Sequence, residues 1–397
     1  MPALPFPAAR QIVLDRLAAA PAPALETVDL PAALGRILAA PVLADRDLPP
    51  TPRSVRDGFA VRSIDTPGTL RLAGEIRAGQ PALHPLEPGT AVEIMTGAPM
   101  PPGADAVVMV EHAERRGRDV TVPAASPGQN FNPPASEARP GQVLLDPGER
   151  FSSRALPLCA SAGAPRLQVF RKPRVAILAT GDEVIPYTQE PAPHQVRNSN
   201  AVSLAAQVSL AGGEPEILPT APDSLDAAIA LIRQGLGAGL LLLSGGVSAG
   251  KYDIVESALH HLGATLFFDR VAIQPGQPLV FGRAGCSFFF GLPGNPASTM
   301  VCFEVFARAA LELLAGRREA PLPFLHAVLE EPFSHRPGLT RFLPARLSPD
   351  GRSVRKLPWT GSSDIPAVAR ANCFLVAAPD TPDYPAGALI PVLYREP

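Results

Sequence analysis

The sequence predicts a multidomain protein of the α/β plus β class. A chain of 397 residues is too long for one ordinary hydrophobic core and suggests about two to four domains. Between Pro173 and Gly316, apolar runs alternate with helical patterns, as in consecutive βαβ units. Elsewhere, short β-rich stretches are separated by Pro and Gly. We therefore expect a mostly parallel, three-layer α/β domain accompanied by smaller β domains and a hinge.

The α/β domain is predicted element by element. Expected strands cover residues 174–179, 216–219, 240–243 and 265–273, with a hairpin formed by 278–281 and 286–290. Expected helices cover 200–211, 225–233, 254–262 and 296–316. The last helix begins where Asn295 can cap and Pro296 can occupy the first helical position, and it ends at Gly316.

The remaining chain divides around this domain. Residues 53–136 are expected to form an inserted β domain, and their flanks, 25–52 and 137–172, a linker and dimerisation domain. Residues 1–24 are expected to form an N-terminal helix packed on the α/β domain, which spans 173–318. Residues 319–397 are expected to form a C-terminal β domain.

Composition excludes several classes of protein. The formal net charge is −2 and no stretch is densely basic, so a nucleic-acid partner is not expected. No segment has the length and apolarity of a signal peptide or a membrane span. The cysteines Cys159, Cys286, Cys302 and Cys373 are scattered, which argues against zinc or disulfide frameworks. These features predict a cytoplasmic protein.

Four loops follow predicted strands and are expected to converge on one crevice. They are residues 180–183, 244–248, 274–278 and 291–296. In open α/β sheets, ligands bind beyond the carboxyl ends of the strands. The loop from Ser244 to Asp253 brings small residues to an anion, but Tyr252 stands where a phosphate-binding P-loop needs Ser or Thr. Glycines that serve only close packing are the alternative interpretation.

Acidic residues suggest a cation in the same crevice. Asp182 and Glu183 are adjacent, and Asp253 lies in the glycine-rich loop. Such oxygen ligands suit Mg²⁺, which commonly bridges to substrate phosphates. Taken alone, the pair could be solvated surface charge, and Asp253 could cap the helix that begins at Ile254. The seven histidines fall outside the motif loops and receive no role.

Taken in order, the motifs resemble those of a known family. They are Ser54–Val61, Met95–Pro99, Ala106–Glu111, Thr180–Glu183, Ser244–Asp253, Gly291–Pro296, Gly361–Ser362 and Arg370–Asn372. This set, at these spacings, resembles the molybdopterin molybdenumtransferases of the MoeA type and the similar C-terminal domain of gephyrin. The likeness extends over nearly the whole chain.

The resemblance implies a homodimer with its active site between the α/β domain of one subunit and the small β domain of the other. It implies that adenylylated molybdopterin and molybdate give molybdenum cofactor and AMP with Mg²⁺ present. Molybdopterin adenylyltransferase and recipient molybdoenzymes are the further partners it suggests. Its implied catalytic residues are Asp57, Thr96, Asp182, Glu183 and Asp253, and its implied metal ligands are Asp182, Glu183 and Asp253. Its implied cofactor-binding residues are Ser244, Gly245, Gly246, Val247, Ser248, Gln274, Gly276, Gln277, Pro293, Gly294, Asn295, Pro296 and Ser298.

Two departures from the family pattern leave alternatives open. The turn that usually reads Lys-Pro-Gly-Lys-Pro is here Gln274 to Pro278, and residues 130–139 lack the family's arginine cluster and paired acids. Missing cations should weaken anion binding by about 1–3 kcal/mol per contact. A catalytically weakened paralogue that binds molybdopterin or a partner enzyme is therefore one alternative. A nucleotide-processing enzyme on the same α/β domain is another.

Overall fold

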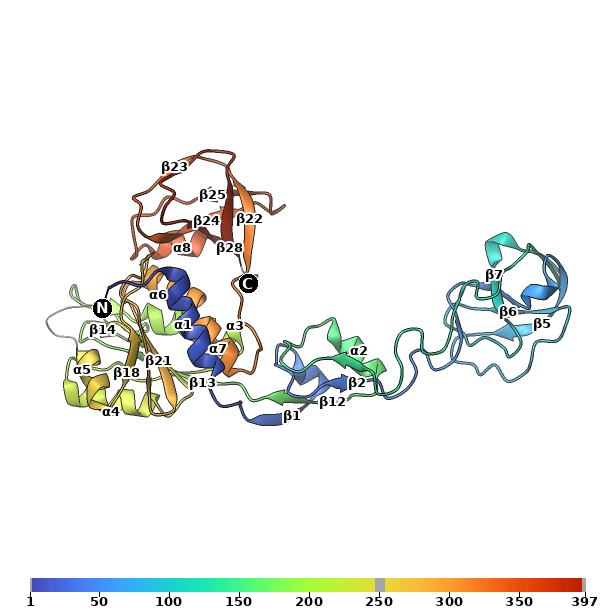
Figure 1. Ribbon diagram of the computed structural model, residues 1–397, viewed down its shortest axis with the longest axis horizontal. Coiled ribbons are helices and arrows are strands. Elements are labelled where there is room, and N and C mark those ends of the chain that lie inside the picture. Colours follow the sequence, from blue (N-terminus) through green and yellow to red (C-terminus); the bar gives the residue numbers. More distant parts are fainter. Residues whose placement is uncertain (1, 247–253, 395–397) are drawn as a thin grey trace.

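The computed structural model describes residues 2–246 and 254–394. Figure 1 shows an extended molecule with the α/β domain at one end and the sheet containing β5, β6 and β7 at the other. A small body with β1, β2, β12 and α2 lies between them, and the C-terminal strands stand beside the α/β domain. The elements that carry the predicted motifs are thus distributed over distant parts of one chain.

The α/β domain has a six-stranded sheet with the order β16-β13-β17-β21-β20-β18. Its parallel part comprises β16 (Glu214–Ile217), β13 (Arg174–Ala179), β17 (Leu240–Ser244) and β21 (Ser287–Leu292). The strand β20 (Val280–Ala284) pairs antiparallel with both β21 and β18 (Thr265–Phe268). The mostly parallel sheet and the predicted hairpin are confirmed.

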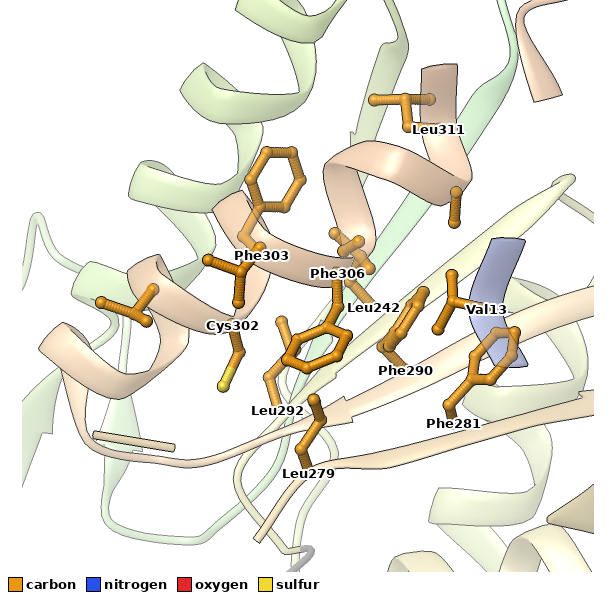
Figure 2. Close-up of a cluster of buried hydrophobic side chains, with 14 of the residues drawn as sticks. Val13, Leu242, Leu279, Phe281, Phe290, Leu292, Cys302, Phe303, Phe306 and Leu311 are labelled. Carbon is orange, nitrogen blue, oxygen red and sulfur yellow. The ribbon is translucent and has the colours of Figure 1, made fainter. Parts of the chain in front are cut away.

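Helices cover both faces of this sheet, because its central strands carry apolar side chains on both faces. One face packs on α1 (Phe6–Ala18), α3 (Ser199–Ala211), α6 (Pro296–Cys302) and α7 (Arg308–Leu314). The other face packs on α4 (Leu225–Gly235) and α5 (Ile254–His261). Figure 2 shows the first core, in which Phe281, Phe290 and Phe306 gather under the last helices. The predicted three layers are confirmed.

The last helix is one run with an irregularity in it. A π-helical turn, Phe303–Ala307, separates α6 from α7, and Gly316 follows with a φ of +91°. Pro296 occupies the first turn as predicted, but the side chain of Asn295 makes no cap hydrogen bond. The Asn295 amide donates instead to Ser362 of the C-terminal domain.

The prediction of one strand over residues 265–273 is wrong. The strand β18 ends at Phe268, and Ile273–Gln274 forms a separate strand, β19, which pairs in parallel with β24 (Thr340–Leu347). Between them the backbone of Arg270 and Ala272 bonds to Leu4, and Ala272 also accepts from Thr340. Asp269 and Arg270 interrupt the apolar run. Val271 and Ile273 are still buried in the core of the α/β domain, although the backbone of this segment pairs outside its sheet. The strand expected at 216–219 also begins earlier, at Glu214.

The C-terminal sheet has the order β19-β24-β25-β22-β28-β26, with β26 also paired to β24. Its strands close into a ring around their own apolar core. The elements are β22 (Phe324–Leu329), β25 (Ser353–Lys356), β26 (Cys373–Ala377) and β28 (Leu389–Tyr394), with the pair β23 (Phe333–Ser334) and β27 (Asp383–Tyr384) and helix α8 (Ile365–Arg370).

The distant β domain has a sheet with the order β7-β4-β6-β5-β9-β8. Its strands are β4 (Gly58–Val61), β5 (Gly68–Ile76), β6 (Thr90–Ile94), β7 (Ala106–Met109), β8 (Glu114–Arg116) and β9 (Asp119–Val122), with 3₁₀ turns at Ser63–Asp65 and Val110–His112. Beside the sheet, β3 (Arg53–Ser54) pairs with β10 (Phe131–Asn132).

The two flanks of this insertion pair with each other. The strand β1 (Leu25–Asp29) pairs antiparallel with β12 (Arg166–Phe170), and β2 (Val42–Leu43) with β11 (Val143–Leu145). A 3₁₀ turn, Leu30–Ala33, and helix α2 (Ala155–Ser161) complete the core of this small body. None of the helices in the described ranges, 2–246 and 254–394, has the length and apolarity needed to cross a membrane.

Candidate active site

A pocket of about 810 Å³ lies where β13, β17 and β21 end. Its walls come from the segments that follow these strands, from the segment 183–200, and from Ser363 and Ile365 of the C-terminal domain. The predicted residues that line it are Glu183, Ser244, Gly245, Gly246, Pro293, Gly294, Asn295 and Pro296. Three of the four predicted loops therefore converge, and the fourth contributes Pro278 alone.

Asn200 joins two of these loops. Its side-chain amide donates to Ser244 Oγ and to the backbone oxygen of Gly294, both at 2.8 Å. Asn200 lies in the first turn of α3, where Asn198 caps the helix by accepting from the N–H of Ala201 at 3.0 Å. The helix start thus fixes the loops after β17 and β21 relative to each other.

Thr180 forms part of the pocket floor. It is only 9% exposed, and its hydroxyl oxygen is buried without a hydrogen-bond partner among the described residues. A methyl group added to Gly246 would lie 2.7 Å from this oxygen, and the φ of Gly246 is +64°. Glycine is therefore required at this point for both its space and its conformation.

The C-terminal domain closes one side of the pocket. The side-chain amide of Asn295 donates to Ser362 Oγ at 2.8 Å, and the N–H of Ala297 donates to the backbone oxygen of Ser362 at 3.0 Å. These bonds explain why Asn295 does not cap its own helix. They also bring the loop before α8 to the start of α6.

Comparison with known proteins agrees with this architecture. Three family models match in succession: the MoeA N-terminal region (domain I and II) over residues 4–163, a probable molybdopterin binding domain over 176–313, and the MoeA C-terminal region (domain IV) over 326–394. A molybdopterin molybdenumtransferase of Bacillus subtilis is 33% identical over 383 residues, which is 93% of this chain and 89% of that protein. The chain belongs to the molybdopterin molybdenumtransferase family.

Other relatives support the same family. A molybdopterin molybdenumtransferase of Nostoc is 37% identical over 303 residues, covering 73% of this chain and 70% of that protein. A crystal structure of a molybdopterin biosynthesis MoeA protein from Pyrococcus horikoshii covers 99% of this chain and 100% of its own, with 26% identity and a TM-score of 0.85. The family resemblance predicted from the motifs is confirmed.

The family's Pro-Gly turn, here Gln274 to Pro278, lies outside the pocket except for Pro278. Gln274 Oε1 accepts a hydrogen bond from the guanidinium of Arg341, and Gln277 is exposed. Gly276 is buried against Cys302, whose Sγ lies 3.7 Å from the Gly276 carbonyl oxygen. Burial raises the pKa of the Cys302 thiol. Gln274 is thus placed at the contact with the C-terminal sheet, whereas Gly276 packs on α6 and Gln277 faces the solvent.

Two further predicted residues of the α/β domain, Asp182 and Ser298, do not line the pocket. Asp182 Oδ1 accepts from the N–H of Asp223 at 3.0 Å, and Ser298 is buried within α6. Val247, Ser248 and Asp253 lie outside the described residues. Of the two predicted metal ligands within the described residues, Asp182 and Glu183, it is Glu183 that lies at the pocket wall.

One of the two adjacent acids fits a common type of magnesium site. Within residues 2–246 and 254–394, no group of three or more His, Cys, Asp or Glu side chains is placed to hold a metal ion. Mg²⁺, however, usually takes one or two carboxylates and completes its shell with water and substrate phosphates. Glu183 places one such carboxylate at the pocket wall, and the adjacent Asp182 lies outside the lining.

Asp57 and Thr96 form a pair at the distant β domain. The N–H and the hydroxyl of Thr96 donate to Asp57 Oδ1 at 2.6 and 2.8 Å. Both hydrogen bonds lower the pKa of Asp57, the backbone bond by more than the hydroxyl bond. This carboxylate is therefore ionised at neutral pH. The pair lies beside β4 and β6, at the opposite end of the molecule from the α/β domain in Figure 1.

Sequence reasoning missed several lining residues. Arg197, Asn198, Ser199 and Asn200 line the pocket at the start of α3, and Ser363 and Ile365 line it from the C-terminal domain. The Asn-Ser pair before the predicted helix was a usable signal, because such residues commonly cap helices. Nothing in the local sequence indicates that Ser363 and Ile365 reach this pocket.

Proposed function

We propose that the protein inserts molybdate into adenylylated molybdopterin and releases AMP, with Mg²⁺ as cofactor. The observation that carries the proposal is the pocket at the carboxyl ends of β13, β17 and β21, lined by the family's loop residues. Its volume of about 810 Å³ suits a substrate of the size of a pterin dinucleotide. Its small and polar lining residues suit a pyrophosphate and an oxyanion.

The residues at the pocket divide into binding and positioning groups. Ser244 to Gly246 after β17, and Pro293 to Pro296 after β21, would enclose the pterin and its phosphate. Val247 and Ser248, which follow Gly246 in sequence, and Ser298 in α6 would assist them. Asn200 positions both loops. Preorganised polar groups stabilise developing charge without the cost of reorienting during the reaction.

Asp182 and Glu183, together with Asp253, would hold Mg²⁺ beside the substrate phosphates. The ion would neutralise phosphate charge and so favour release of AMP. Changing Asp182 to Asn or Glu183 to Gln should abolish turnover while leaving folding intact. Arg174→Gln is a suitable control, because it removes an exposed charge at the amino end of β13, whereas the pocket lies at the carboxyl end of that strand.

A homodimer would explain the position of the Asp57–Thr96 pair. This pair and the pocket lie at opposite ends of one chain, so a second subunit would have to bring the pair to the pocket. The ionised Asp57 would then act as a hydrogen-bond acceptor or orient a positively charged group, rather than donate a proton. We further propose that the enzyme works in the cytoplasm with molybdopterin adenylyltransferase and recipient molybdoenzymes.

A mixing experiment tests the shared site. Subunits with Asp57→Asn and subunits with Glu183→Gln are each expected to be inactive alone. A mixed dimer would contain one site with neither substitution, and activity should reappear when the two variants are co-refolded. Activity that stays absent in verified mixed dimers would mean that both residues act within one subunit.

The central assay supplies purified protein with adenylylated molybdopterin, Mg²⁺ and molybdate. Molybdate-dependent AMP release should occur, and the product should activate a molybdenum-free apo-enzyme. The glutamines at 274 and 277 favour one alternative, a weakened paralogue that binds the pterin without efficient turnover. Pterin binding without molybdate-dependent AMP release would reject the enzyme and support that alternative.

A further inference from the structure

The pocket wall contains a positive charge that the family motifs do not include. Arg197 lines the pocket, and among its described lining residues Arg197 is the only cation and Glu183 the only acid. The turn expected to supply cations carries Gln274 and Gln277 instead, and neither lines the pocket. Among the described lining residues, Arg197 therefore supplies the favourable charge for an anionic substrate.

The backbone holds Arg197 in a defined position. Two short strands, β14 (Val184–Ile185) and β15 (Val196–Arg197), pair in parallel with Ile185 opposite Arg197. The N–H of Val196 donates to Glu183 and that of Asn198 to Ile185, each at 2.8 Å. The next residue, Asn198, caps α3. The side chain thus begins from a backbone that is fixed on both sides.

Among the described residues, the guanidinium of Arg197 donates one hydrogen bond, from Nε. Arg197 Nε donates to the backbone oxygen of Gln189 at 2.9 Å. No ion pair joins Arg197 to an acidic side chain in the described part of the chain, and the residue is exposed. The Gln189 bond orients the planar group and leaves its two terminal nitrogens as donors in a fork that matches a phosphate or a similar oxyanion.

A second polar group at the pocket is the hydroxyl of Thr180. The hydroxyl of Thr180, in a side chain that is 9% exposed, has no hydrogen-bond partner among the described residues. Buried hydroxyls are normally satisfied, so such a group is commonly explained by a ligand or water. The cation of Arg197 and the unsatisfied hydroxyl of Thr180 both belong to this one pocket.

We propose that Arg197 is the oxyanion-binding residue of this pocket and replaces the charge missing from the Pro-Gly turn. This inference rests on the proposed function and names the group that holds the substrate's anion. The group that Arg197 binds is an oxyanion in either case, a phosphate or molybdate. The two sources, the pyrophosphate of the pterin substrate and free molybdate, are distinguished by the experiment below.

The test compares Arg197→Gln with wild type and with the control Arg174→Gln. The control removes the same charge from the same domain, at the amino end of β13 and away from the pocket. Arg197→Gln should raise the KM for one of the two substrates, adenylylated molybdopterin or molybdate, by about tenfold, because a charge-assisted contact is lost. The melting temperature should change little. A raised KM for adenylylated molybdopterin identifies the phosphate, and a raised KM for molybdate identifies the oxyanion substrate. The KM of Arg197→Lys should lie between those of wild type and Arg197→Gln, since lysine keeps the charge but loses the planar pair of donors.

Direct binding separates this inference from the proposed function. AMP and molybdate are titrated into each full-length variant by calorimetry at low and high salt. Weaker binding of either ligand to Arg197→Gln, with a smaller salt dependence, supports the inference even if wild type releases no AMP. Affinities and KM values equal to those of wild type and of Arg174→Gln would overturn it, whether or not kcat changed.

Discussion

Two Pro-Gly turns of similar sequence have different structural roles. The turn Gly291 to Pro296 follows β21, a central strand of the parallel sheet, and four of its residues line the pocket. The turn Gln274 to Pro278 follows β19, a strand of two residues that pairs with the C-terminal sheet. Its first side chain bonds to Arg341 and its glycine packs on Cys302. The sheet that the preceding strand joins therefore decides whether such a turn faces the ligand or a neighbouring domain.

Gly276 gives the largest expected effect on stability. Its φ is +109°, and an added methyl group would lie 2.4 Å from Cys302 Sγ. Gly276→Ala should lower the free energy of unfolding by about 2–4 kcal/mol, from backbone strain and overpacking together. Urea unfolding monitored by circular dichroism measures it. Gly285→Ala is the matched control, with a φ of +58° and open space, and an equal loss there would mean that the contact with Cys302 adds nothing.

Asn200 connects the turn after β21 to the loop after β17. Replacing it tests whether stability and catalysis depend on this connection. Asn200→Ala removes both amide hydrogen bonds, and the loss should be about 1–2 kcal/mol in stability and at least about tenfold in kcat/KM. Ser362→Ala is the control, since it removes the bond from Asn295 at a residue outside the pocket lining and leaves the joint between the loops intact. If the control lowers kcat/KM equally, closure by the C-terminal domain matters as much as the alignment of the loops.

The two glutamines provide a direct comparison within one turn. Gln274→Lys would place a second cation against Arg341 and should lower the free energy of unfolding by about 1–2 kcal/mol. Gln277 is exposed, so Gln277→Lys should change that free energy by less than about 0.5 kcal/mol. Thermal unfolding measures both. Adding Arg341→Gln to Gln274→Lys should recover part of the loss. A double variant no more stable than Gln274→Lys alone would exclude repulsion as the cause.

Cys302 gives a smaller, pH-dependent effect behind the same turn. Burial raises the pKa of its thiol above the ordinary value of 9.0, so the folded chain keeps a proton that the unfolded chain releases. The free energy of unfolding should be independent of this thiol below about pH 9 and should fall above it, by at most about 1.4 kcal/mol per pH unit. Urea unfolding at pH 8 and 10 measures the difference.

Cys302→Ala should show a shallower fall between these pH values, although cavity formation lowers its stability at both. Cys159 and Cys373 have thiols whose pKa is also raised by burial, so part of the decline should remain. The same slope in Cys302→Ala and wild type would mean that this thiol is not shielded in the folded state.

Much of the fold could be predicted from local patterns. The strands 174–179 and 240–243 are continuous apolar runs because helices cover both of their faces. Pro296 and Gly316 mark the ends of the last helix through backbone chemistry that each residue carries alone. Family motifs then located the loops at the pocket. These features depend on short stretches of chain, so the sequence predicts them.

Only the tertiary structure decided where the remaining residues lie. The segment 265–273 has two apolar stretches separated by Asp269 and Arg270, and their division between two sheets depends on Leu4 and Thr340, which are distant in sequence. Arg197 and Asn200 became parts of the site because the starts of β15 and α3 fold against the strand ends. By itself the sequence determined the elements, the family and the loops. Long-range pairing decided which loops meet, because strand partners are chosen by burial and backbone bonding across the whole chain.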